Sequence, residues 1–408
     1  MRINSRRNDR EDYYKTLTRV GQEVDRTLTR FLDEDQFGET KLFMYEPLLK
    51  RKLGKQKLRA TLAYLSYCAL SEHNPDDSID PDIMKLMTVA ELELWAEYTA
   101  NWIVDNKGEV RNDPMNRMKA VISAKSFLED AVRIASQVGS IYVPRVLDAS
   151  GYVSTSWMEE LVTNLSNTEL RNGSLEEYMK AYRINFSIPG VGKTVSLGAD
   201  LVALYLGKYE TPQARKLHEI FVEFGIEGQT LNGLGDFIRL KRDFTTNKAR
   251  ADQFADIRNG IMTPPIWFMY NGANDEEREF ILDCVGKSSL TDEEESRLVK
   301  LLFETGSYDM ISKGLKKGGR TIRGLIKGLE FKNEGAAQLE MAVTILDSNR
   351  IYPDLRENYF DVAGIDWNSE NVPNQPLKTR YNDYLREEYD GLKRRMINHD
   401  SKTTSNLS

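Results

Sequence analysis

The stretch SIPGVGKTVSLGADLVALYLG, residues 187–207, joins a Gly-Lys-Thr triplet to a very apolar segment. From Lys193 onward, apolar residues recur at the i, i+3, i+4 and i+7 spacing of an amphipathic helix. The stretch therefore predicts a helix that begins at a lysine and a threonine. A helix N-terminus carries a partial positive charge, so a lysine placed there favours an anionic ligand such as a diphosphate.

The triplet is also a near match to the phosphate-binding loop of nucleotide hydrolases. That loop reads G-x-x-x-x-G-K-[ST] and lies between a buried strand and a helix. Ser187 stands where the first glycine is required, and the preceding EEYMKAYRINF (176–186) is typical of a helix end. Alternating strand and helix patterns are missing from the whole sequence. These differences argue against a nucleotide site.

The helical spacing of apolar residues continues through most of the chain, whereas the alternation typical of strands is scarce. It is clear in the windows 57–70, 87–105, 118–138, 214–244 and 335–349. We therefore predict an all-α protein in three parts. These are a charged helical N-terminal arm (1–40), a helical domain (41–350) and a C-terminal segment (351–408) with a helix and a disordered tail.

Composition describes an ordinary soluble protein. The net charge of −7 gives no overall attraction to nucleic acid or to anionic lipid. The chain has 2 cysteines and 3 histidines, which excludes a disulfide framework and a histidine-rich metal site. No apolar run approaches the ~18 residues of a membrane span, and no secretory signal follows the basic N-terminus. We expect a cytoplasmic protein.

Further motifs accompany the Lys-Thr pair, in an order that matches one known family. They are LGKQKLRA (53–60), GQTLNGLGDFIR (228–239) and ADIRNGIMTPP (255–265), and the pair itself begins KTVSL (193–197). Together they resemble the diphosphate-binding and aspartate-rich motifs of the trans-prenyl diphosphate synthase family. The resemblance implies an all-α, isoprenoid synthase-type helical bundle around a central apolar cavity.

The resemblance also implies a prenyl diphosphate substrate and Mg²⁺, which aspartates of two facing helices hold through their oxygen atoms. The residues that it assigns to the diphosphate are Lys57, Arg59, Arg111, Lys193 and Thr194.

The departures from the family fall in the metal sites. Where the first array reads Asp-Asp-x-x-Asp, this chain has NWIVD (101–105), so Asp105 survives while Asn101 and Trp102 replace two aspartates. In the second array, the three aspartates become Gly235, Asp236 and Arg239. Leu94 replaces the family histidine, Asn112 the second arginine of a pair, and Ile261 a loop lysine.

Two interpretations stay open. In the first, the protein is a remodelled enzyme that ionises an allylic prenyl diphosphate and transfers or cyclises the prenyl group. Asp105 and Asp236 are then catalytic, and Arg239 meets the diphosphate directly. Glu97, Asn101 and Asp105 form one polar stripe at i, i+4 spacing, and Asp236 and Asp243 belong to a second. The metal ligands would be Asn101, Asp105, Asp236 and Asp243.

In the second interpretation, the protein is a non-catalytic or regulatory subunit of an active prenyl diphosphate synthase. The polar stripes are then solvated helix faces, whose ion pairs contribute roughly 0.2–0.5 kcal/mol each. The family implies a homodimer or a heterodimer with a related synthase. A separate segment, SKGLKKGGRTIRGLIKG (312–328), concentrates 6 cations among 5 glycines. It flanks the diphosphate site, binds an anionic partner, or forms a solvated basic helix.

Overall fold

A computed structural model describes residues 2–35, 38, 40–41, 44–45, 57–104, 113–151, 164–182, 191–237, 254–329, 331 and 333–347. These parts of the chain are helical, and their only β-structure is an isolated bridge between Asn164 and Ile261. The elements are α1 (Arg2–Asp33), α3 (Leu58–Ser71), α4 (Pro81–Val104), α5 (Pro114–Val138), η2 (Ser140–Tyr142), α7 (Thr168–Asn172), α8 (Leu175–Lys180), α9 (Lys193–Tyr205), α10 (Pro212–Gly235), α12 (Ala255–Arg258), α13 (Pro264–Gly272), α14 (Asp275–Asp283), α15 (Asp292–Glu304), α16 (Ser307–Lys327) and α17 (Glu334–Asp347). Among these helices, none is both long enough and apolar enough to cross a membrane.

Side-chain caps explain where several helices begin. Asn274 before α14 and Thr291 before α15 form complete capping boxes with the glutamates three residues later. Thr211 accepts a hydrogen bond from the backbone N–H of Ala214 at the start of α10, where Pro212 takes the first helical position. These starts are fixed by short-range sequence.

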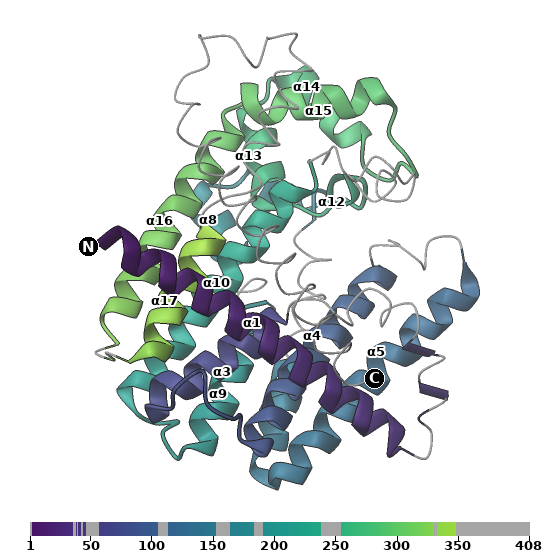
Figure 1. The fold of residues 1–408 in the computed structure, drawn as a ribbon. Helices are drawn as coiled ribbons and strands as arrows, with labels where there is room; N and C mark the ends of the chain where they lie inside the picture. The colour runs from purple at the N-terminus through teal and green to yellow at the C-terminus, as the bar shows by residue number, and fades with distance from the viewer. Residues whose placement is uncertain are drawn as a thin grey trace, which may run out of the picture.

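Helices α3, α4 and α9 form the centre of one part of the molecule, with α1, α5 and α10 around them (Figure 1). A second part holds α12–α15 around an apolar cluster that includes Trp267, Ile281 and Leu298. The long helices α10 and α16 run from one part into the other, and their apolar residues pack in both. Two of the apolar clusters of the core thus share these helices.

Gly198 sets the spacing of the central helices. A Cβ atom at this position of α9 would lie 2.7 Å from Cβ of Ala63 on α3 and 3.4 Å from Cβ of Ala90 on α4. Real Cβ atoms do not approach as closely as the first distance, so only glycine lets the three helices pack at this separation. The two alanines complete a crossing made of small side chains.

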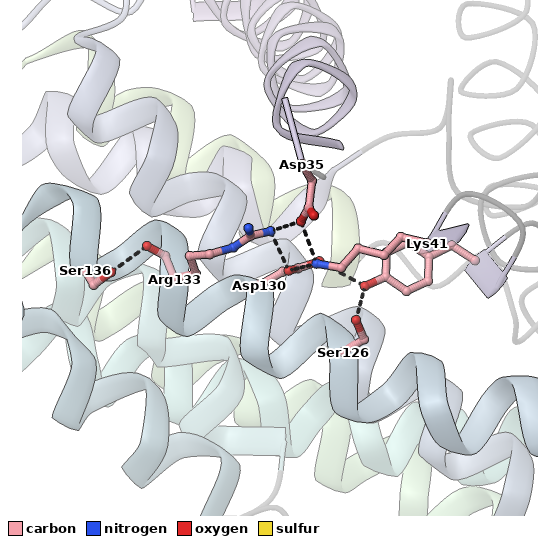
Figure 2. A network of polar contacts seen from close by, with 7 residues as sticks. Asp35, Lys41, Ser126, Asp130, Arg133 and Ser136 are labelled. Atoms are coloured by element: carbon pink, nitrogen blue, oxygen red, sulfur yellow. Dashed lines mark hydrogen bonds and ion pairs between the residues drawn. The ribbon is translucent and has the colours of Figure 1, made fainter. Parts of the chain in front are cut away.

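The predicted N-terminal arm packs against the domain along most of its helix. Leu17, Val20, Val24 and Leu28 of α1 are each no more than 3% exposed. Beyond the end of α1, the nearly buried Asp35 accepts hydrogen bonds from Lys41 and from Arg133 of α5, as Figure 2 shows.

Asp130, also on α5, completes this network. Its carboxylate binds Lys41 and Arg133 and accepts a 2.9 Å hydrogen bond from the Tyr45 hydroxyl (Figure 2). Its side chain is only 1% exposed, so the surrounding cations and the hydroxyl satisfy a buried carboxylate. The network therefore joins the end of α1 to α5. The predicted boundary at residue 40 stays a prediction, and segment 351–408 lies outside the described residues.

Helix α17 packs beside α1 and α3, close to the start of the fold (Figure 1). Asn333, just before α17, donates hydrogen bonds to the carbonyl oxygens of Ala69, at 2.9 Å, and Cys68, at 3.3 Å. These carbonyls belong to the last turn of α3, where the helix leaves its acceptors unused. The late helix α17 is thereby fastened to the end of an early one.

Candidate functional site

Lys57 directly precedes α3, and its ammonium group lies against α1. Its Nζ atom is 2.9 Å from Oδ1 of Asp25 on α1 and 6.0 Å from the centre of the Trp95 ring on α4. Lys57 is only 1% exposed. A carboxylate of the chain itself therefore balances the charge of this predicted diphosphate ligand, and α1 helps to cover it.

Arg59, in the first turn of α3, forms a salt bridge with α4. Its Nη2 atom lies 3.0 Å from Oε2 of Glu97, and both side chains are largely buried. The other terminal nitrogen, Nη1, is buried and has no hydrogen-bond partner within the described parts of the chain. Glu97 belongs to the polar stripe expected to face a metal, but here it holds an arginine.

Glu93 lies one turn before Glu97 on the same face of α4 and is 2% exposed. Burial raises the pKa of Glu93 from its ordinary 4.5 to about 8; the charge of Glu97 adds to the rise and Arg59 opposes it. Its Oε2 atom is buried without a hydrogen-bond partner among the described residues. At neutral pH this carboxyl group is mainly protonated, so it adds little negative charge beside the salt bridge of Arg59 and Glu97.

The last turns of α4 carry the two residues that replace aspartates of the first array. Asn101 is partly exposed, whereas Trp102 is 6% exposed and belongs to an apolar cluster shared with α5. The Trp102 ring meets that of Tyr98 edge to face, with centroids 5.1 Å apart. Trp102 is therefore part of the packing between helices. Asp105 and Arg111 lie outside the described residues.

Helix α9 begins at Lys193, after Gly192, as the sequence predicts. Lys193 is partly exposed, and Thr194 is fully buried. The Thr194 hydroxyl donates its hydrogen to the carbonyl oxygen of Val191, at 3.1 Å. A hydroxyl has a single hydrogen to donate, so in this arrangement Thr194 offers none to a diphosphate, whose oxygens only accept.

Asp236 follows the last residue of α10 and caps the short helix α12. Its Oδ1 accepts a hydrogen bond from the backbone N–H of Ala255 at 3.1 Å, and its Oδ2 accepts one from Asp256 at 3.0 Å. Its own carbonyl oxygen accepts from Phe254, a buried residue in the left-handed region with φ 56°. Both oxygens of this predicted metal ligand therefore bind backbone groups. Arg239 and Asp243 lie outside the described residues.

The structure brings together Lys57 and Arg59 with α4, but pairs each with an internal carboxylate. Asn101 and Trp102 lie at least two helical turns beyond Glu93 on α4. The carboxylate of Asp236 accepts hydrogen bonds at the start of α12. Within the described ranges, no group of three or more histidine, cysteine, aspartate or glutamate side chains could hold a metal ion.

Sequence reasoning missed Asp25 and Glu93. Glu93 could have been found from the sequence, because it lies four residues before Glu97 on an otherwise apolar helix. Two glutamates that share one face of such a helix indicate a common buried partner.

No protein-family model matches the sequence, and no curated protein does. Solved structures match the fold. A decaprenyl diphosphate synthase from Rhodobacter capsulatus has a TM-score of 0.65 and 13% identity, covering 82% of this chain and 98% of that one. A polyprenyl synthase from Caulobacter crescentus CB15, complexed with calcium and isoprenyl diphosphate, has a TM-score of 0.65 and 14% identity over 84% of this chain and 98% of that chain.

The chain has the fold of the polyprenyl diphosphate synthases. A geranylgeranyl pyrophosphate synthetase from Pyrococcus horikoshii agrees, with a TM-score of 0.63 and 15% identity over 83% of this chain and 99% of its own. The prediction of an all-α, isoprenoid synthase-type fold is confirmed, and the chain is a divergent example of it. The predicted site residues stay predictions, because a shared fold at this identity assigns no chemistry to them.

Proposed function

We propose that this chain is a non-catalytic protein built on the prenyl diphosphate synthase fold and that it acts as the partner subunit of an active synthase. The observation that carries the proposal lies at the start of α3, where Asp25 holds Lys57 and Glu97 holds Arg59. A diphosphate that binds here must either displace these carboxylates or share the two cations with them. Displacement gains little, because the carboxylate left behind stays desolvated. Sharing places the diphosphate beside two largely buried negative charges that repel it.

The fit of a magnesium cluster supports the same proposal. A solved synthase of this fold is complexed with isoprenyl diphosphate and magnesium. Magnesium requires oxygen ligands, usually with one or two carboxylates among them. Asn101 offers a neutral amide, and the carboxylate of Asp236 already accepts two backbone N–H groups. The described residues do not fit such a cluster.

An exposed apolar face on α5 supports the partner role. Met115, Met118, Val121 and Ile122 are 56%, 52%, 51% and 48% exposed. Their spacing places them on one side of the helix, within two turns. Contiguous exposed apolar side chains of this kind mark interaction sites. We assign this face to the contact with a synthase of the same fold.

The remodelled enzyme is the second candidate, and the start of α9 favours it. Gly192 provides no side-chain cap there, so the helix start can meet an anion beside Lys193. In this candidate, Mg²⁺ and Asp105, Arg111, Arg239 and Asp243 complete the site. The protein then ionises an allylic prenyl diphosphate and transfers or cyclises the prenyl group.

Turnover separates the candidates. Purified protein with Mg²⁺ is incubated with geranyl, farnesyl or geranylgeranyl diphosphate, with and without isopentenyl diphosphate, and released diphosphate is measured. We expect no release above the protein-free control. Release that Lys193→Ala abolishes would establish the enzyme and overturn the proposal.

Association is tested separately, by affinity purification of the chain from its own cells and mass spectrometry. We expect a synthase with intact aspartate arrays, and we expect Met118→Glu with Ile122→Glu to release it. Leu175→Glu with Met179→Glu, at two exposed apolar positions on α8, is the matched control. Recovery of no synthase, together with a monomeric mass by light scattering, would contradict the partner role.

A further inference from the structure

Helix α16 presents a row of cations to solvent. Lys313, Lys317, Arg320 and Lys327 are exposed, while the opposite side of the helix is packed in the core. The buried side consists of Ile311, Leu315, Ile322 and Ile326. The four cations, which we call the α16 cationic face, extend over about 21 Å at 1.5 Å per residue.

The cations of this face outnumber the carboxylates of α16 by four to one. The single carboxylate of the helix is Asp309, in its first turn and four residues before Lys313, and residues 310–329 contain no aspartate or glutamate. In the part of the chain that the structure describes, none of the four cations takes part in an ion pair. Exposed lysines elsewhere do pair along their helices, as Lys125 does with Glu129 and Lys300 with Glu304. The electrostatic potentials of these cations therefore reinforce one another along α16, although the whole chain carries a net charge of −7.

The shape of the face selects among anionic partners. Gly314, Thr321 and Gly324 are exposed between the cations, so small side chains leave the surface even. Helix α16 lies along an outer edge of the molecule (Figure 1). Met310, 43% exposed, begins the same face one turn before Lys313. No aromatic side chain lies between residues 309 and 329 to stack on a nucleic-acid base.

We propose that the α16 cationic face binds the surface of a membrane that contains anionic phospholipids. The four cations contact the headgroup phosphates, and Met310 enters the interface at one end of the helix. Basic side chains near an anionic leaflet each add to the attraction, which falls with salt because it acts over about one Debye length. The proposal does not depend on the proposed function, since it uses none of the residues assigned to diphosphate or to a partner synthase.

Vesicle flotation tests the proposal on the full chain. One set of vesicles contains phosphatidylcholine alone, and the other contains phosphatidylcholine with phosphatidylserine. We expect the protein to float only with the second set and to be released by added salt. Lys313→Glu with Lys317→Glu should weaken binding by about tenfold or more. Lys125→Glu with Lys180→Glu makes the same change in net charge on α5 and α8 and should leave flotation unchanged.

Several outcomes would overturn the proposal. Equal binding to both sets of vesicles would show that anionic lipid is not recognised, and equal loss in both pairs of variants would show that net charge alone acts. No flotation, combined with α16-dependent binding of single-stranded RNA in the same buffer, would assign the face to nucleic acid. All substituted positions are exposed, and circular dichroism verifies that each variant keeps the helical fold.

Discussion

Oε2 of Glu97 lies 3.0 Å from Nη2 of Arg59, so a glutamate on α4 holds the arginine that family resemblance assigns to a diphosphate. The salt bridge joins α3 to α4 within a largely buried environment. It changes the role expected of both residues. Arg59 becomes a partner of the chain's own carboxylate, and Glu97 is removed from the stripe of expected metal ligands.

Arg59→Met should destabilise the protein by about 3 kcal/mol, because Glu97 is left largely buried without its counter-charge. The double variant Arg59→Met with Glu97→Met should recover most of that loss, since no buried charge remains. Urea unfolding of the wild type, both single variants and the double variant measures the coupling. A single-variant loss below about 1 kcal/mol would instead describe a solvent-screened pair.

Glu93→Gln should remove a pH dependence of stability. With its pKa raised from 4.5 to about 8, Glu93 holds its proton more tightly in the folded state than in the unfolded chain. Stability from this group is therefore greatest below pH 4.5. It falls as the unfolded chain ionises, by at most about 1.4 kcal/mol per pH unit, until the folded group also ionises near pH 8.

The measurement for Glu93 is urea unfolding at several pH values from about 5 to about 9. The advantage of the Glu93→Gln variant over the wild type should grow through this range and level off at its upper end. Glu223→Gln, at a partly exposed position on α10, provides a comparison. A constant difference between Glu93→Gln and the wild type would mean that Glu93 has an ordinary pKa in the folded protein.

Gly198→Ala should cost about 1–3 kcal/mol, because its new methyl group would lie 2.7 Å from Cβ of Ala63. The matched control is Gly228→Ala on α10, where a Cβ atom meets nothing within 4 Å. That variant should be neutral or stabilised by up to about 1 kcal/mol, through its higher helix propensity. Thermal and urea unfolding check both. Equal effects of the two substitutions would contradict the close crossing of α3, α4 and α9.

Asp236→Ala should cost about 1 kcal/mol through loss of the α12 cap, and the cost should not depend on Mg²⁺. Asn274→Ala removes the cap of α14 and serves as a comparison of similar size. Thermal unfolding with and without Mg²⁺ measures both. Stabilisation of the wild type by Mg²⁺ that disappears in Asp236→Ala would make Asp236 a metal ligand and contradict its purely structural role.

The separation in sequence between two interacting residues explains which contacts could be predicted from the sequence. Helical spacing and the order of the motifs are local or collinear properties, so the fold and the helix that starts at Lys193 were predictable. The partners of Lys57 and Arg59 were not, because Asp25 and Glu97 lie on other helices and are brought close only by packing. Asp236 caps residues 19 and 20 positions further on, a distance at which no local rule applies.

The hydrogen bond from Asn333 to Ala69 also has a consequence for biosynthesis. These residues are 264 positions apart, so the early helices α1 and α3 are synthesised long before α17. At ribosomal rates of about 5–20 residues per second, the delay is roughly 10–50 s. During that time, the apolar side of α3 that α17 covers is exposed on the nascent chain. Productive folding therefore favours conditions that protect this surface until α17 is released.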